Sequence, residues 1–137
     1  MNRTWNPGTV APPFAAYSLC SHIPNNSTLL TIAGQVGVMP DGTLAQGIEA
    51  QCEWALKNVL EVLQANGMRA QDLVKLGTYL TDRDQLAAYR RVRQTILGDH
   101  VVPPSTLVIV SGLADPAWLV EVEAYAARPP PEEKGTK

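Results

Sequence analysis

The chain has 137 residues and a net charge of -2 at pH 7, from 11 lysines and arginines and 13 acidic residues. This length suffices to bury the core of one domain without disulfides or a structural metal. The near-even charge leaves no basic stripe to neutralise phosphates, so it argues against a nucleic-acid binder.

Two strands are predicted first along the chain, at 17–23 and 28–35, with the Pro-Asn-Asn turn at 24–26 joining them as a hairpin. An amphipathic helix follows at 47–65, because apolar residues recur there at the helical spacing. This first half of the chain therefore predicts a hairpin followed by one long helix.

A third strand is predicted at 72–81, and a second helix follows it and ends near Leu97. This helix presents on one side Leu86, Tyr89, Arg93, Ile96 and Leu97. Two further strands, at 106–111 and 119–127, complete the order. Together the elements predict an α+β fold in which a β-sheet carries two helices on one face.

The last predicted strand carries two glutamates on one face. Alternation puts Val120 and Val122 on one side of the strand and Glu121 and Glu123 on the other, together with Tyr125. The two carboxylates are then separated by roughly 7 Å along the strand. Their face is too mixed for a dry core and too apolar for open water, so an oligomer interface that contains a cleft would explain it.

Residues 1–127 are predicted to form a single domain, and 128–137 a flexible, Pro-rich C-terminal tail. No apolar run approaches the ~20 residues of a membrane span, and the first nine residues are unlike a signal peptide. We therefore expect a cytoplasmic protein with no membrane partner. The histidines and cysteines lack the spacing of metal ligands, so no metal is predicted.

Four stretches, in this order, resemble the Rid (YjgF/YER057c/UK114) family: AAYS at 15–18, AGQVGVMPDG at 33–42, VKLGTYLTD at 74–82 and LVEVEAYA at 119–126. The resemblance spans nearly the whole chain. It implies a single Rid-like domain with a chorismate-mutase-like (YjgF-type) fold. It also implies a homotrimer whose sheets form an inner barrel, with ligand clefts between subunits and no cofactor.

The activity implied by the resemblance is hydrolysis of reactive enamines and imines, such as 2-aminoacrylate, to a keto acid and ammonia. Glu123 matches the family's cleft glutamate, which is thought to activate the attacking water, and one carboxylate can both accept and return a proton. Tyr17 matches a cleft tyrosine that helps close the site, and Gly34 matches a close backbone approach. A structural hydrogen bond for Glu123, a partly buried aromatic ring for Tyr17 and a strand bulge for Gly34 are the alternatives.

The remaining candidates for substrate binding are less specific. Glu121 shares the face of the matched glutamate, and an interface ion pair is its alternative role. Trp118 lies beside the last strand, where it would either wall the cleft or pack between subunits. Ser105 is expected to line the site, without the partners that would make it a nucleophile.

Two positions depart from the pattern of the deaminating subgroup. Pro104 stands where that subgroup carries an arginine, which would bind a substrate carboxylate through a bidentate pair of hydrogen bonds. Ala33 stands where a serine is usual. We hypothesise that Arg90, on the second helix, supplies an anion-binding charge from a different wall of the cleft, and a solvated helix arginine is the alternative.

Three functions follow from these observations. The first is hydrolytic deamination with non-standard specificity, of which a 2-aminomuconate-like substrate is one case. The second is a non-catalytic trimer that binds small metabolites in a regulatory or chaperone-like role. The third, a translation-inhibiting ribonuclease, is the least favoured because the chain is slightly acidic.

Overall fold

The structure is a computed structural model that describes residues 2–131. Its main sheet has the strand order β3-β6-β4-β5. These strands are β3 (Thr28–Val36), β4 (Leu73–Leu80), β5 (Ser105–Ile109) and β6 (Val120–Arg128). The two helices are α1 (Ile48–Ala65) and α2 (Leu86–Leu97), and single 3-10 turns at Ala70–Asp72 and Arg83–Gln85 precede β4 and α2.

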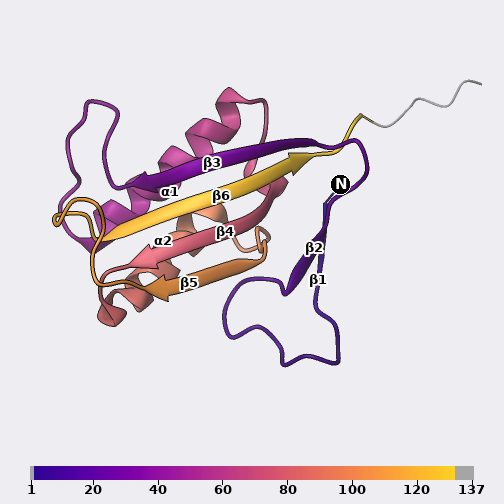
Figure 1. Cartoon of the computed structure of the whole chain (residues 1–137), viewed down its shortest axis with the longest axis horizontal. Helices are drawn as coiled ribbons and strands as arrows, with labels where there is room; N and C mark the ends of the chain where they lie inside the picture. Colours follow the sequence, from indigo (N-terminus) through magenta and orange to yellow (C-terminus); the bar gives the residue numbers. More distant parts are fainter. Residues whose placement is uncertain (1, 132–137) are drawn as a thin grey trace, which may run out of the picture.

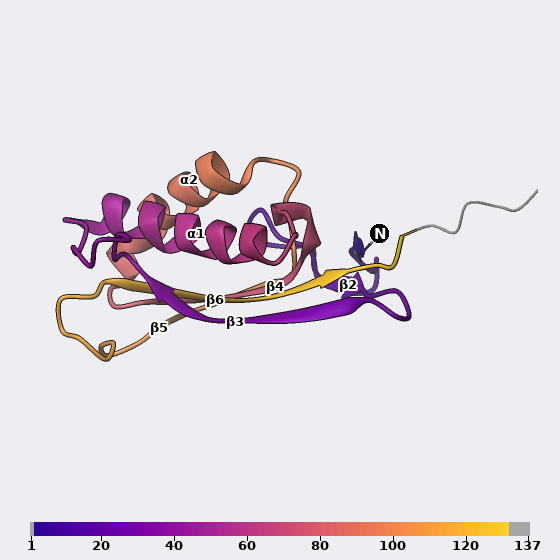
Figure 2. The same ribbon diagram turned by 90° about the horizontal axis from the view of Figure 1, so that it is seen from above.

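Both helices lie on one face of the sheet, and the opposite face is left open (Figures 1 and 2). β3, β6 and β4 pair antiparallel, whereas β4 and β5 pair parallel because α2 carries the chain back across the sheet. The predicted α+β fold with two helices on one face of a sheet is thereby confirmed.

The core fills the space between the sheet and the helices. Leu76 and Leu80 of β4 and Val120 and Val122 of β6 are completely buried in one cluster with apolar residues of α1 and α2. In both strands the buried residues alternate with partly exposed ones, as the period of a strand requires. The alternation read from the sequence is therefore confirmed for β4 and β6.

The predicted hairpin between 17–23 and 28–35 is wrong. Only β2 (Cys20–His22) forms in the first segment, and it pairs with the short β1 (Arg3–Trp5) in a separate two-stranded sheet. β3 instead pairs with β6, because its side chains Leu30 and Ile32 pack into the core beneath the helices. Burial of apolar side chains decided the strand pairing here, not closeness along the chain.

The open face of the sheet carries both glutamates of β6 together with exposed apolar side chains. Leu29 is 68% exposed, Val108 41% and Tyr125 46%. This composition agrees with the mixed face expected from the sequence, and the homotrimer that would cover it stays a prediction.

The strand β6 ends at Arg128, one residue beyond the predicted domain end. The predicted tail, 128–137, lies outside the described residues from 132 onward. Neither helix is both long and apolar enough to span a membrane, as judged over residues 2–131. The cytoplasmic location stays a prediction.

Candidate functional site

Each glutamate on the open face lies beside a glycine of a neighbouring strand. Gly77 of β4 is the direct cross-strand partner of Glu123, and a Cβ there would come within 2.8 Å of its Oε1. Gly34 lies in a bulge of β3, and a Cβ there would collide with the carboxylate of Glu121. The missing side chains thus give both carboxylates the space they occupy. The bulge that was the alternative at Gly34 is present, whereas the close backbone approach in a ligand cleft stays a prediction.

Tyr79 of β4 holds one of these carboxylates. Its hydroxyl donates a hydrogen bond of 2.8 Å to Oε1 of Glu123. The hydrogen bond and the negative charge of Glu123 raise the pKa of the Tyr79 phenol, so it keeps its proton and remains a donor. Sequence reasoning missed Tyr79, although its alternation with Gly77 along β4 already placed the two on one face.

Two hollows on the open face meet at Glu123. One has a volume of about 400 Å³ and lies between Gly34, Tyr79, both glutamates and the loop at 110–114. The other, of about 350 Å³, contains Lys75 and Thr106, whose side chains are joined by a 2.9 Å hydrogen bond. Both spaces are large enough for a small metabolite beside the carboxylate.

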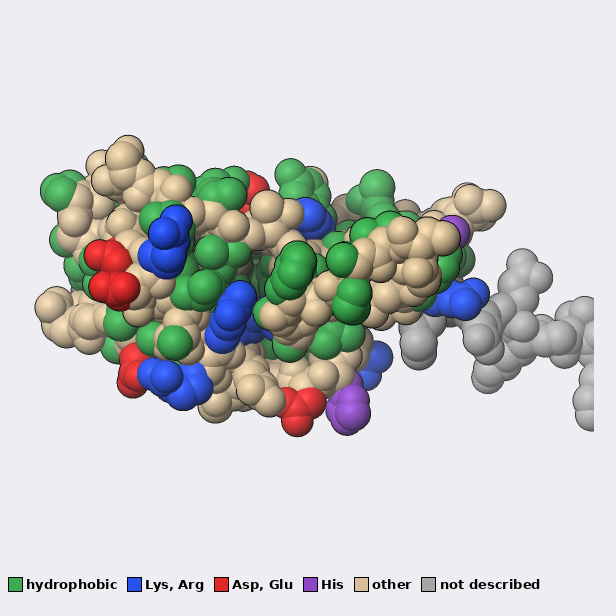
Figure 3. Space-filling view, turned by 90° about the horizontal axis from the view of Figure 1, so that it is seen from below, with side chains coloured by type: hydrophobic (Ala, Val, Ile, Leu, Met, Phe, Trp, Pro, Cys, Tyr) green, Lys and Arg blue, Asp and Glu red, His purple; other side chains and the backbone are tan. Residues whose placement is uncertain are grey.

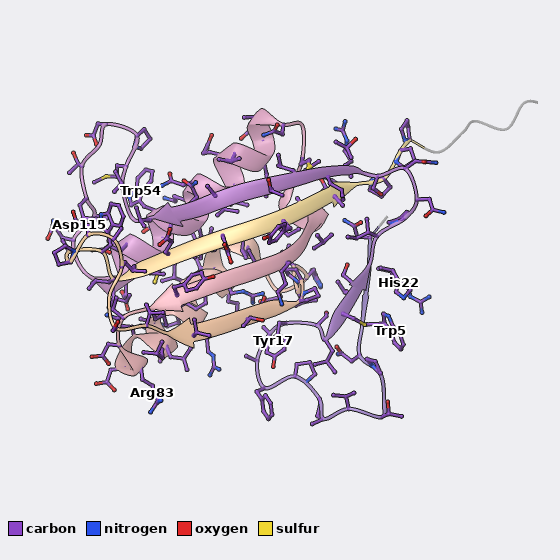
Figure 4. The ribbon with its side chains drawn as sticks, in the orientation of Figure 1. Trp5, Tyr17, His22, Trp54, Arg83 and Asp115 are labelled. Carbon is purple, nitrogen blue, oxygen red and sulfur yellow. The ribbon has the colours of Figure 1, made fainter. Side chains whose placement is uncertain are left out.

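A third pocket, of about 290 Å³, lies between the loop at 14–17, α2 and β5. It brings together three predicted site residues, Tyr17, Arg90 and Ser105. Tyr17 lies on the loop beside the beginning of β5 (Figure 4). In a single chain, Tyr17 and Glu123 thus line different spaces, and a joint catalytic role for them stays a prediction.

The third pocket adjoins one of the hollows on the open face. Thr78 and Thr106 line both this pocket and the hollow that contains Lys75. The hydroxyl of Thr78 is 2.7 Å from that of Tyr89 in a buried hydrogen bond. Residues of β4 and β5 therefore lie between the pocket that contains the arginines and the hollow around Glu123.

The remaining predicted residues are not among those that line these three spaces within residues 2–131. Ala33 is exposed in the bulge of β3. Pro104 directly precedes β5, where its carbonyl accepts a 3.0 Å hydrogen bond from Leu76 N–H. Trp118 is half-buried in the loop before β6.

The loop before β6 is held by the buried amide of Gln51. Its Nε2 donates to the carbonyl of Ala117 at 3.2 Å, and its Oε1 accepts from Leu119 N–H at 2.9 Å. These two bonds flank Trp118 and fix the entry to β6. They place the two glutamates that follow on the strand.

Among the described residues, no cluster of three His, Cys, Asp or Glu side chains could hold a metal ion. The expected absence of a metal and of an organic cofactor stays a prediction.

Comparison with known proteins gives a consistent result over most of the chain. Residues 8–128 match a family model described as Endoribonuclease L-PSP. Protein mmf2, mitochondrial, of Schizosaccharomyces pombe is 32% identical over 103 residues, which cover 72% of this chain and 79% of that protein. The 2-iminobutanoate/2-iminopropanoate deaminase of Salmonella typhimurium is 27% identical over 104 residues, 74% of this chain and 80% of that enzyme.

A solved structure is also similar. It is the structure of YyfB from Yersinia pestis, a protein of unknown function of the conserved Rid family. It is 32% identical, with a TM-score of 0.80, and the match covers 93% of this chain and 98% of that one.

Proposed function

The chain belongs to the Rid family, whose model is described as Endoribonuclease L-PSP, and from that membership we propose that it hydrolyses a reactive enamine or imine metabolite to a carbonyl product and ammonia. The observation that carries this proposal is the carboxylate of Glu123, which lies in two hollows and is held by the phenol of Tyr79. The name of the relative from Salmonella typhimurium, an imine deaminase, supports the reaction class.

The proposed reaction needs one group that moves protons. An enamine first tautomerises to the imine. Glu123 then takes a proton from water as the water oxygen bonds to the C=N carbon, and it passes this proton to the imine nitrogen. In the resulting amino alcohol, Glu123 takes the hydroxyl proton and delivers it to the amino nitrogen. The C–N bond then breaks, ammonia leaves and the carbonyl forms. Because Tyr79 occupies Oε1 of Glu123, the second carboxylate oxygen is left for the water.

The substrate is proposed to be non-standard for this reaction class. The side chain of Pro104 has no hydrogen-bond donor. The position directly before β5 therefore cannot form the bidentate hydrogen bonds with a carboxylate that an arginine would form. A 2-aminomuconate-like compound is one case that fits an altered specificity.

The proposed assembly is a homotrimer with the substrate in a cleft between subunits. Its support is the open face of the sheet, where Leu29, Val108 and Tyr125 remain exposed in the single chain. Covering these side chains with a second copy would remove apolar surface from water. Glu123 lies on the same face, so such an assembly would also exclude water from its hollows.

The experiment measures ammonia and carbonyl product from freshly generated 2-aminoacrylate and 2-aminomuconate, with and without the protein. Release several-fold above the spontaneous rate on either compound supports the proposal. If neither is accelerated by a folded oligomer, the non-catalytic, metabolite-binding function is favoured instead. An RNA substrate incubated in parallel tests the endoribonuclease activity that the family description names.

A further inference from the structure

Arg93 of α2 is a buried cation in the wall of the third pocket. The residue is only 8% exposed. It lies on the side of α2 whose other buried residues are apolar or aromatic. Nη1 donates a 2.6 Å hydrogen bond to the carbonyl of Ala16, whereas the buried Nη2 meets no acceptor within the described chain. Arg93 is among the residues that line the pocket, so a guanidinium with one unsatisfied, buried N–H group lies at this site.

No carboxylate of residues 2–131 forms an ion pair with Arg93. The ion pairs found there join Lys57 to Glu53 and Arg91 to Glu49. Burial lowers the pKa of Arg93, yet a guanidinium remains charged at neutral pH. A buried positive charge without a counter-charge destabilises the folded protein. An anion from outside the chain, bound next to Arg93, would offset this cost.

The pocket around Arg93 is built for an organic anion. Arg90, one turn earlier on α2, is exposed and lines the same pocket, so it adds a second positive charge at the mouth. None of the described residues that line the pocket is acidic. Phe14, Leu86 and Leu107 make other parts of its wall apolar. On the face drawn in Figure 3, a basic side chain lies among apolar ones near the middle, and the acidic side chains lie nearer the margins, where further basic ones are also found.

Several hydroxyl groups that line the pocket already take part in hydrogen bonds within the chain. Thr78 and Tyr89 hydrogen-bond to each other, and Ser105 Oγ donates to the carbonyl of Pro103 at 3.1 Å. The volume of about 290 Å³ suits a molecule of a few carbon atoms. An apolar wall with one buried cation favours a short organic acid over free inorganic phosphate.

We propose that this pocket binds the carboxylate of a small 2-oxo or 2-imino acid, with Arg93 as the buried cation that holds it and Arg90 as a second cation at the mouth. Arg93 takes the role that the sequence had suggested for Arg90 alone, and it acts from α2 instead of from position 104. The identification of this acid as substrate or product rests on the proposed deaminase function, whereas the binding of the carboxylate does not.

The test is a titration of the intact protein with pyruvate, followed by calorimetry and by NMR of backbone amides. Uncharged pyruvamide and inorganic phosphate serve as comparison ligands. Arg93→Met removes the charge and keeps an apolar chain of similar length. Arg93→Lys keeps the positive charge but lacks the planar guanidinium group, which can donate two parallel hydrogen bonds to a carboxylate. Arg91→Met is the matched control, because Arg91 lies on the same helix but pairs with Glu49 away from this pocket.

The proposal predicts that pyruvate shifts the amides of Ala16, Tyr17 and α2, and that its Kd rises at least about tenfold in Arg93→Met. A smaller rise is expected in Arg93→Lys and in Arg90→Met, and none in Arg91→Met. Thermal stability of Arg93→Met should hold or rise, because an unpaired buried charge has been replaced by an apolar chain.

Three results would overturn the proposal. One is an unchanged Kd in both Arg93→Lys and Arg90→Met, which remains decisive if Arg93→Met fails to fold. Another is a set of amide shifts away from the pocket. The third is equal binding of pyruvamide or of phosphate. Pyruvate binding without any deaminase activity would instead contradict the proposed function and leave the carboxylate site standing.

Discussion

The phenol of Tyr79 and the carboxylate of Glu123, 44 residues apart in the chain, are joined by a hydrogen bond of 2.8 Å on the open face of the sheet. Tyr79→Phe should lower kcat about tenfold, because the carboxylate loses the group that orients it. The melting temperature should change little, since the hydroxyl lies at an open face. Steady-state ammonia release checks the first expectation and thermal unfolding the second.

A double variant sharpens this prediction. If Tyr79 acts through Glu123, adding Tyr79→Phe to Glu123→Gln should cause no further loss of activity. Independent, multiplying losses would show that Tyr79 acts on the substrate or on folding and not through the carboxylate.

The glycines beside the two glutamates provide a second prediction. Gly77→Ala should displace the carboxylate of Glu123, and Gly34→Ala that of Glu121, because each new Cβ would lie too close to the carboxylate oxygen. Both neighbours are flexible side-chain ends, so the fold should survive. We expect Gly77→Ala to lose activity at least about tenfold and Gly34→Ala to lose less.

Gly8→Ala is the matched control, because a Cβ at Gly8 would meet no atom within 4 Å. Activity assays are to be paired with far-UV circular dichroism for all three variants. Full activity in a folded Gly77→Ala protein would contradict the placement of Glu123 at the reacting centre.

The sequence was sufficient to predict which side of β4 and β6 faces the core. The period of a strand is fixed by backbone geometry, so Val120 and Val122 had to share one side and the glutamates the other. The pairing of β3 was not predictable in this way, since its partner lies about ninety residues further along the chain. The positive φ of Asn26 does mark a turn, but that turn does not join two paired strands.

The candidate site was predictable only in part. The resemblance pointed to Glu123 and Tyr17, and alternation could have added Tyr79. Helical periodicity placed Arg93 on the apolar side of α2, but a sequence cannot show that no carboxylate of residues 2–131 pairs with it. That fact depends on which segments of the chain fold against α2.

The two cysteines should differ in reactivity. Cys52 is completely buried in the core, and burial raises the pKa of its thiol to about 12. Cys20 is half-exposed, and its Sγ donates to the carbonyl of Trp5 at 3.2 Å. At pH 8 a disulfide reagent should label Cys20 in the native protein, and Cys52 only after unfolding.

The same shift predicts a pH dependence of stability. Because the folded chain keeps the Cys52 proton up to about pH 12 and the unfolded chain loses it near 9.0, the free energy of unfolding should fall as the pH rises through that window. Urea unfolding between pH 8 and 10.5 measures this slope. Cys52→Ala should reduce it and Cys20→Ala should not; equal slopes in all three proteins would refute the assignment.

The exposed apolar side chains of the open face test the assembly. Val108→Glu places a charge where the proposed trimer would bury the side chain, so the variant should sediment as a monomer. Val10→Glu is the control, because Val10 is also exposed but lies on the loop between β1 and β2. A Val108→Glu protein of unchanged mass would show that the open face is not the interface.

The central claim is that Glu123, and not simply a charged sheet face, carries out the hydrolysis. The most direct measurement is the rate of ammonia release from freshly generated 2-aminoacrylate and 2-aminomuconate by the wild type, Glu123→Gln and Glu121→Gln. On the substrate that the wild type accelerates, we predict that Glu123→Gln falls at least about a hundredfold, close to the spontaneous rate, while Glu121→Gln retains much of the activity. A fully active, folded Glu123→Gln protein would contradict the account.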